Sequence, residues 1–242
     1  NCVANGKILK EKIFKNMWIQ PASGDAGGAL GAALAVYYLM LGNKRNTDEN
    51  RDSMKGSFLG PSYSDNEIEN TLLKLKAKYS KLNMEEIGEK VSEDLKSGKA
   101  IGWMQGRMEF GPRALGGRSI IADPRSPKMQ KLLNLKVKFR ESFRPFAPSI
   151  LFEDLSDWFE TNNSSPYMLY VSNITRDKRI KDESKDNLFG IELLKRKRSQ
   201  IPAVTHVDNS ARVQTVHEDT NPKYYKLIKK FKEITGCPIL VN

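Results

Sequence analysis

Arginine and lysine side chains are concentrated in one stretch of the chain that glycine and proline interrupt. Residues 107–144 hold ten Lys or Arg against three acids, so they contribute +7 of the net charge of +11. Arginine offers a planar fork of donors that matches phosphate and carboxylate oxygens, and it stays charged at any usable pH. Gly111, Gly116 and Gly117 can take positive φ and let backbone amides approach an anion. The stretch therefore predicts a binding site for an anion such as phosphate.

A second glycine-rich segment, SGDAGGALGAA at residues 23–33, precedes an apolar run. Such a turn can present backbone amides and a helix N-terminus to a ligand. Asp25 in this turn could cap the helix or bind a metal. The apolar residues 29–41 are shorter than the roughly 18 residues that a membrane span needs, so we expect a buried helix and no membrane partner.

The composition indicates one main domain and part of another. With 242 residues and 39% hydrophobic content, the chain can bury one good core or two modest ones. Its two cysteines, Cys2 and Cys237, lie far apart and indicate neither a disulfide framework nor a zinc site, which favours a cytoplasmic protein. The chain has no starting Met or secretory signal, and we expect it to be a piece of a longer protein.

Local patterns indicate the elements that position these residues. Ser64 and Glu67 form a capping-box pattern, and an amphipathic helix is expected at residues 84–97. A strand at residues 100–105 leads into the arginine-rich stretch. Ser126 and Pro127 predict a helix start, and that helix should carry Lys136, Lys138 and Arg140 near its C-terminal end.

The C-terminal part of the sequence alternates charged and β-like segments. Residues 175–200 read as a charged insertion, and residues 203–207 and 211–216 read as a hairpin around a turn at 208–210. A helix at 221–235 and a final strand follow. The fold class is mixed α/β, with a domain boundary in the polar stretch at 42–56 that separates residues 1–56 from residues 57–242.

The segments GRMEFGPRALGGRS, KFRESFRPFAP, SPYM, PAVTHVD and ARVQTV follow one another in this order along the chain. Together they resemble the NodU-type O-carbamoyltransferases, which carbamoylate nodulation factors and antibiotics. The resemblance implies that residues 57–242 form a YrdC-like domain, a mixed twisted sheet with flanking helices. Residues 1–56 would be the tail and connector of an ASKHA-like domain, whose larger part is missing here.

The resemblance also implies a reaction. The YrdC-like domain would convert carbamoyl phosphate and ATP, bound with Mg²⁺, into carbamoyl adenylate. The ASKHA-like domain would pass the carbamoyl group to a hydroxyl on a sugar or natural product. The resemblance does not identify the acceptor or the role of residues 175–200. It also leaves the oligomeric state open, with a homodimer as one alternative.

Specific residues fall on the motifs of this family. Arg113, Arg118, Lys138, Arg144 and Arg212 would bind carbamoyl phosphate and nucleotide phosphates, with Lys138, Arg144 and His206 as catalytic residues. Gly27 and Gly28 would contact nucleotide in the first domain, and Asp25 would bind iron or another divalent metal in the intact protein. The histidine pair that completes this metal site in the family has no counterpart, because the only histidines, His206 and His217, lie in the other domain.

Other interpretations stay open at the level of sequence. Each arginine could be a structural ion-pair partner, and His206 could be a hydrogen-bonded structural residue. A pI near 9.5 is also compatible with an RNA-binding module related to YrdC, although no RNA-binding motif is present. A catalytically inactive interaction domain is the third interpretation.

Overall fold

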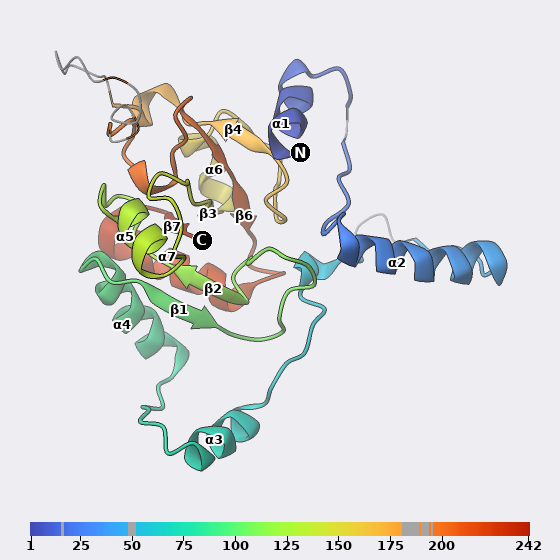
Figure 1. Ribbon diagram of the computed structural model, residues 1–242, viewed down its shortest axis with the longest axis horizontal. Helices are drawn as coiled ribbons and strands as arrows, with labels where there is room; N and C mark the ends of the chain where they lie inside the picture. Colours follow the sequence, from blue (N-terminus) through green and yellow to red (C-terminus); the bar gives the residue numbers. More distant parts are fainter. Residues whose placement is uncertain (16, 48–51, 181–188, 190–193, 195) are drawn as a thin grey trace.

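The computed structural model describes residues 1–15, 17–47, 52–180, 189, 194 and 196–242 (Figure 1). Seven α-helices are present in these ranges. They are α1 (Cys2–Glu11), α2 (Asp25–Ala35), α3 (Asp65–Lys74), α4 (Met84–Lys96), α5 (Met129–Lys136), α6 (Leu155–Trp158) and α7 (Pro222–Thr235). A π-helical turn, Val36–Met40, extends α2. Part of the predicted insertion at 175–200 lies outside the described residues.

Short strands form three small sheets in the described residues. β1 (Ile101–Met104) pairs antiparallel with β2 (Arg118–Ile121), and β4 (Val171–Asn173) pairs antiparallel with β5 (Ser210–Arg212). β3 (Pro148–Leu151) lies between β6 (Gln214–Val216), which is parallel to it, and β7 (Ile239–Val241), which is antiparallel. The mixed α/β class is confirmed, but the strands are divided among small sheets instead of forming one continuous sheet.

Helix α7 packs against α4 and against β3 and β7, and it supplies much of the core (Figure 1). Its buried face includes Tyr224, Leu227 and Phe231, each with no exposed surface. The helix ends follow from the sequence, because Asn221 caps the N-terminus and Gly236 takes the left-handed conformation, φ 73°, after the last turn. The capping box of Ser64 and Glu67 is likewise confirmed at the start of α3.

The first residues of the chain pack on the C-terminal part. Asn5 donates a side-chain hydrogen bond to the carbonyl of Leu169 at 2.7 Å. A Cβ added to Gly6 would lie 2.4 Å from the carbonyl oxygen of Val171, so a glycine is required where α1 approaches β4. Helix α1 is therefore fixed on the sheet of β4 and β5.

Helix α2 extends away from the rest of the protein (Figure 1), and none of its residues is buried. In the following turn the exposed fraction reaches 83% for Leu39 and 77% for Met40. The prediction of a buried helix at residues 29–41 is therefore wrong for this chain: Leu30 packs against the cluster of Met54, Leu115 and Tyr167, but most of the other apolar side chains are exposed. No helix in the described ranges has the length and apolarity to cross a membrane.

Two further sequence predictions need correction. Residues 202–204 form a 3₁₀ turn instead of a strand, so the expected hairpin is absent and β5 pairs with β4. Proline at 202 cannot donate to a strand ladder, which favours this turn. Helix α5 begins at Met129 and ends at Lys136, so Lys138 and Arg140 lie in the loop after the helix.

Candidate functional site

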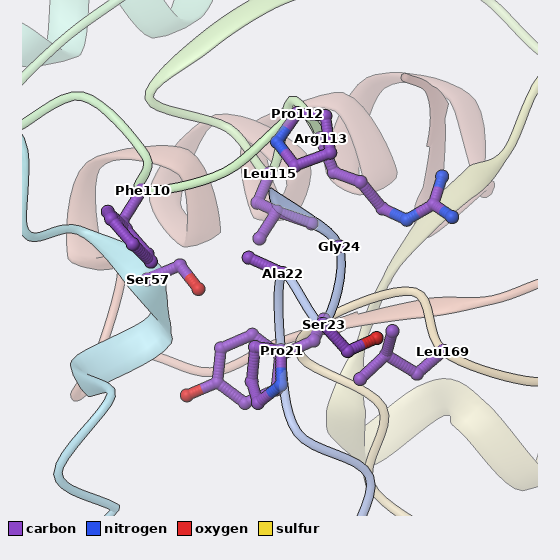
Figure 2. A pocket seen from close by; sticks show the side chains of 11 residues that line it. Pro21, Ala22, Ser23, Gly24, Ser57, Phe110, Pro112, Arg113, Leu115 and Leu169 are labelled. Atoms are coloured by element: carbon purple, nitrogen blue, oxygen red, sulfur yellow. The ribbon is translucent and has the colours of Figure 1, made fainter. Parts of the chain in front are cut away.

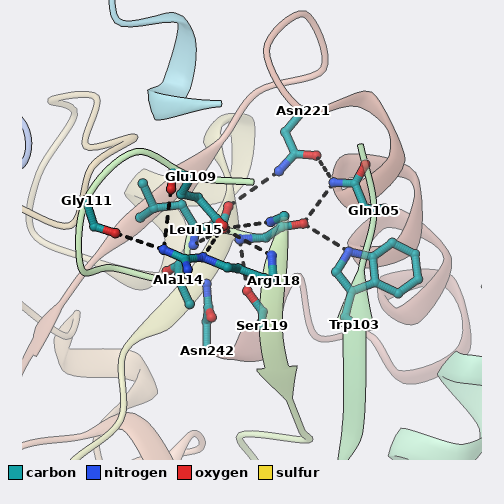
Figure 3. Close-up of polar contacts among 12 residues, drawn as sticks. Trp103, Gln105, Glu109, Gly111, Ala114, Leu115, Arg118, Ser119, Asn221 and Asn242 are labelled. Carbon is teal, nitrogen blue, oxygen red and sulfur yellow. Dashed lines mark hydrogen bonds and ion pairs between the residues drawn. The ribbon is translucent and has the colours of Figure 1, made fainter. Parts of the chain in front are cut away.

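A buried carboxylate organises the glycine-rich loop between β1 and β2 (Figure 3). The Glu109 side chain has no exposed surface. Its Oε1 accepts hydrogen bonds from the amides of Leu115 at 2.7 Å, Gly117 at 2.8 Å and Arg118 at 3.2 Å. Amides of the glycine-rich loop, that of Gly117 among them, therefore surround a carboxylate of the loop itself.

Arg118 belongs to the same network. Its Nε donates to Glu109 Oε2 at 3.2 Å, and its Nη2 donates to the carbonyls of Glu109 and Gly111 (Figure 3). These hydrogen bonds use Nε and Nη2, while none of the contacts described for Arg118 uses Nη1. Arg118 thus has a structural role in holding the loop, and a phosphate contact would have to come from the remaining donor.

Positive φ values confirm part of the glycine prediction. Gly111 has φ 105° and Gly116 has φ 102°, whereas Gly117 lies outside this region. A Cβ on Gly111 would lie 2.5 Å from the Cβ of Ala22, which directly precedes the glycine-rich segment at residues 23–33. This close contact brings the turn before α2 next to the arginine-rich loop.

A small cavity of about 130 Å³ lies at this junction (Figure 2). It is lined by the turn at residues 21–24, by the loop at 110–115 and by Tyr167 and Leu169. Arg113 is the one cation among the lining residues, and Ser23 and Ser57 contribute hydroxyl groups. The cavity has room for about four water molecules, which suits a small polar ligand.

Arg113 lies close to arginines from distant parts of the sequence. The pKa of Arg212, a half-buried residue of β5, is lowered by burial, then by the positive charge of Arg113 and also by that of Arg140. Burial and the charge of Arg144 lower the pKa of Arg140 in turn. We call these four residues, Arg113, Arg140, Arg144 and Arg212, the arginine cluster.

Little negative charge balances the arginine cluster. Arg144 forms an exposed ion pair with Glu141 at 3.1 Å. In the described part of the chain no carboxylate forms an ion pair with Arg113 or Arg212. Like charges held together in partly buried positions raise the free energy of the protein, and a bound anion would relieve this repulsion.

The other predicted residues of this domain lie in different settings. Lys138 is exposed in the loop after α5. His206 is half-buried, and its Nδ1 shares a hydrogen bond of 3.0 Å with the hydroxyl of Ser210, which also donates to Asp208 at 2.7 Å. Burial lowers the pKa of His206, although Asp208 opposes the shift. The contacts of His206 are those of a residue that stabilises the turn at 206–210.

The residues predicted in the first domain surround the N-terminus of α2. Gly24 is the N-cap, and Asp25 is an exposed residue of the first turn. A Cβ on Gly27 would lie 2.5 Å from the carbonyl oxygen of Ala22, so Gly27 is needed for packing, while Gly28 faces open space. The described residues contain no group of three or more His, Cys, Asp or Glu side chains that could hold a metal. Asp25 is thus not joined by further ligands in this part of the chain.

Sequence reasoning missed two residues of this region. Glu109 was included only in the charge count of the sequence. Its position in a glycine-rich loop, where backbone amides need acceptors, indicates that its carboxylate binds those amides. Arg140 was expected only as a charge near the end of a helix, yet it stacks over the Phe146 ring at 4.9 Å and its charge acts on Arg212. No local pattern distinguishes Arg140 from its exposed neighbours, because its partners come from folding.

Comparison with known proteins gives a consistent result over the whole chain. Residues 92–242 match the carbamoyltransferase C-terminus family, and residues 1–34 match the carbamoyltransferase N-terminus family. An uncharacterized protein of Synechocystis is 55% identical, with all of this chain covered and 40% of the relative.

Two relatives with functional names are also similar over the whole chain. The nodulation protein NolO of Bradyrhizobium diazoefficiens is 39% identical, and the 3'-hydroxymethylcephem-O-carbamoyltransferase of Streptomyces clavuligerus is 31% identical; 40% of each is covered. The chain thus spans about two fifths of the length of these relatives. With the family match extending over more than half of its residues, the chain belongs to the NodU-type carbamoyltransferase family.

Proposed function

We propose that the arginine cluster binds carbamoyl phosphate and that the longer protein transfers the carbamoyl group to an acceptor hydroxyl. The family assignment supports carbamoyl transfer in general. The donor, the nucleotide and the site residues are inferences from the geometry and from the resemblance.

One observation carries the proposal, namely that Arg212 is half-buried, experiences the positive charge of Arg113 and forms no ion pair in the described part of the chain. A guanidinium forms strong, often bidentate hydrogen bonds with phosphate oxygens. A dianionic phosphate group placed between Arg113 and Arg212 would neutralise both charges. Lys138 and Arg144 are close in sequence to Arg140 and would extend the same positive surface.

The proposed chemistry needs little covalent participation by the protein, because phosphoryl transfer depends mainly on positioning and charge stabilisation. Water cleaves carbamoyl phosphate to carbamate and phosphate. A carbamate oxygen then attacks the α-phosphorus of ATP and pyrophosphate leaves, which gives carbamoyl adenylate. The acceptor hydroxyl finally attacks the carbamoyl carbon and AMP leaves. The arginines hold the anions in each state, and Mg²⁺ accompanies ATP.

Gly27, Gly28 and Asp25 belong to the second half of the proposal. The N-terminus of α2 has free amides that favour an anion, and Gly28 leaves space beside them. We assign nucleotide binding to this end of α2 and metal binding to Asp25 in the longer protein. No step above depends on the metal, since the described residues do not complete its site.

The test compares Arg212→Gln with Lys131→Gln, an exposed cation on α5 outside the cluster. Loss of a charge-assisted hydrogen bond should weaken carbamoyl phosphate binding about tenfold to a hundredfold for Arg212→Gln, as measured by calorimetry. Lys131→Gln should bind like the unchanged chain. The same variants should differ in pyrophosphate release from ATP that depends on carbamoyl phosphate.

Two results would refute the proposal. One is equal binding of carbamoyl phosphate by both variants. The other is no binding of carbamoyl phosphate or ATP by the unchanged chain together with tight RNA binding that falls steeply with salt, which would favour the RNA-binding interpretation.

A further inference from the structure

The loop after α5 holds a strained backbone conformation next to the arginine cluster. Phe139, between Lys138 and Arg140, has φ 48°, and the residue is 84% exposed. Positive φ is unfavourable for a bulky residue, and it persists only where the surroundings fix it. Because the exposed Phe139 ring has little packing to fix this conformation, other contacts must hold the loop.

Asn134 provides such contacts from inside the protein. It lies on α5 and has no exposed surface. Its Nδ2 donates to the carbonyl of Arg144 at 2.8 Å and to that of Ser142 at 3.2 Å. Its Oδ1 accepts a hydrogen bond from Arg140 Nε, and its backbone carbonyl accepts one from the Arg140 amide at 3.0 Å. One buried residue therefore contacts both arginines that this loop contributes to the cluster.

The amide group of Asn134 suits this task electrostatically. Arg140 and Arg144 repel each other and Arg140 also repels Arg212, so the loop would tend to move outward when no anion is bound. A carboxylate at position 134 could also bind Arg140, but it would neutralise charge that the anion needs and could not donate to the two carbonyls. An amide restrains the loop and leaves the positive charge intact.

We propose that Asn134 is a positioning residue that holds Arg140 and Arg144 in the geometry that receives the phosphate group. This inference rests on the proposed function and adds to it a residue that does not itself touch the substrate. It also assigns Arg140, through its contacts with Asn134 and Phe146, to the binding surface.

The test uses Asn134→Asp, which keeps the shape of the side chain and the acceptor for Arg140, and Asn134→Leu, which removes every side-chain hydrogen bond and keeps the backbone contact with the Arg140 amide. Both variants should bind carbamoyl phosphate about tenfold more weakly or worse in calorimetry at a temperature where they remain folded. The Nε–H resonance of Arg140 in NMR should keep its protection from solvent exchange in Asn134→Asp and lose it in Asn134→Leu.

Leu133→Ala is the matched control, since Leu133 is the neighbouring fully buried residue of α5 and faces the core. It should lower the melting temperature while the dissociation constant for carbamoyl phosphate stays within about twofold of the unchanged chain. An Asn134→Asp protein that binds as tightly as the unchanged chain would overturn the positioning role, and so would a Leu133→Ala protein that loses as much affinity. Failure of the unchanged chain to bind carbamoyl phosphate would instead overturn the proposed function itself.

Discussion

Glu109 is a carboxylate without exposed surface, and the loop that carries the family motif is wrapped around it. Three backbone amides and the Arg118 guanidinium donate to it, so its charge is fully used inside the loop. The loop therefore keeps its shape without a ligand. Arg113 belongs to the same loop, and its side chain lines the cavity. The rigid loop therefore holds the backbone of Arg113 in place.

The Glu109 network predicts a large loss of stability on truncation. Glu109→Ala should lower the free energy of unfolding by about 3 to 5 kcal/mol, because the Arg118 charge and three amides lose their common partner. Urea denaturation measures this value. Glu89→Ala is the control, since Glu89 is 57% exposed in its ion pair with Lys230 and should cost at most about 1 kcal/mol. Similar losses in the two variants would contradict the structural role of Glu109.

At the scale of elements, the loop between β1 and β2 is packed directly on α7. Trp103 of β1 donates its indole N–H to the carbonyl of Gly116 at 3.0 Å, and Gln105 donates to the same carbonyl at 2.8 Å. Gln105 also donates to Asn221, the N-cap of α7, at 2.8 Å (Figure 3). The hairpin, the loop and the start of the last helix thus form one hydrogen-bonded unit.

Gly116 is the tightest point of this unit. A Cβ there would lie 2.3 Å from Cδ1 of the buried Tyr224, and the residue has positive φ. Gly98 also has positive φ, 88°, but no atom lies near its missing Cβ. Gly98→Ala should therefore cost about 1 to 2 kcal/mol from backbone strain alone, and Gly116→Ala should cost at least about 2 kcal/mol more from overpacking. Chemical denaturation of both variants checks the difference, and an equal cost would show that the contact with Tyr224 is unimportant.

At the scale of the whole molecule, the two histidines should make stability depend on pH. Burial is the main cause that lowers the pKa of both His206 and His217 in the folded protein, whereas in the unfolded chain it stays near 6.5. The unfolded state then binds more protons as the pH falls through about 6.5, so the free energy of unfolding decreases. The loss of stability ends only once the pH is below the pKa values that the two histidines have in the folded protein.

Urea denaturation at pH 7.5, 6.5 and 5.5 measures this dependence above the range where carboxylates titrate. A chain with His206→Asn and His217→Asn should show a flatter pH profile than the unchanged chain. Identical profiles would mean that other groups cause the dependence.

The sequence determined the features that depend on neighbouring residues. Hydrogen bonds between residues a few positions apart fix helix ends, so Ser64 with Glu67 marked the start of α3 correctly, and the helix expected at 221–235 agrees with α7 to within one residue. The order of motifs gave the family, and the charge count located the cationic stretch. The buried helix at 29–41 failed because burial depends on a distant partner surface, and the hairpin at 203–216 failed because residues 202–204 form a 3₁₀ turn and β5 pairs with the distant β4.

Only the tertiary structure decided which charges are balanced and which are not. Arg118 and Arg113 look alike in the sequence, but folding places Glu109 in hydrogen-bonding contact with Arg118, whereas Arg113 acts on Arg212 as a like charge. Electrostatic energy depends on distance in space and on burial, and neither can be read from sequence spacing when the partners lie on different strands and loops. The charges were therefore visible in the sequence, but their pairing was a property of the fold.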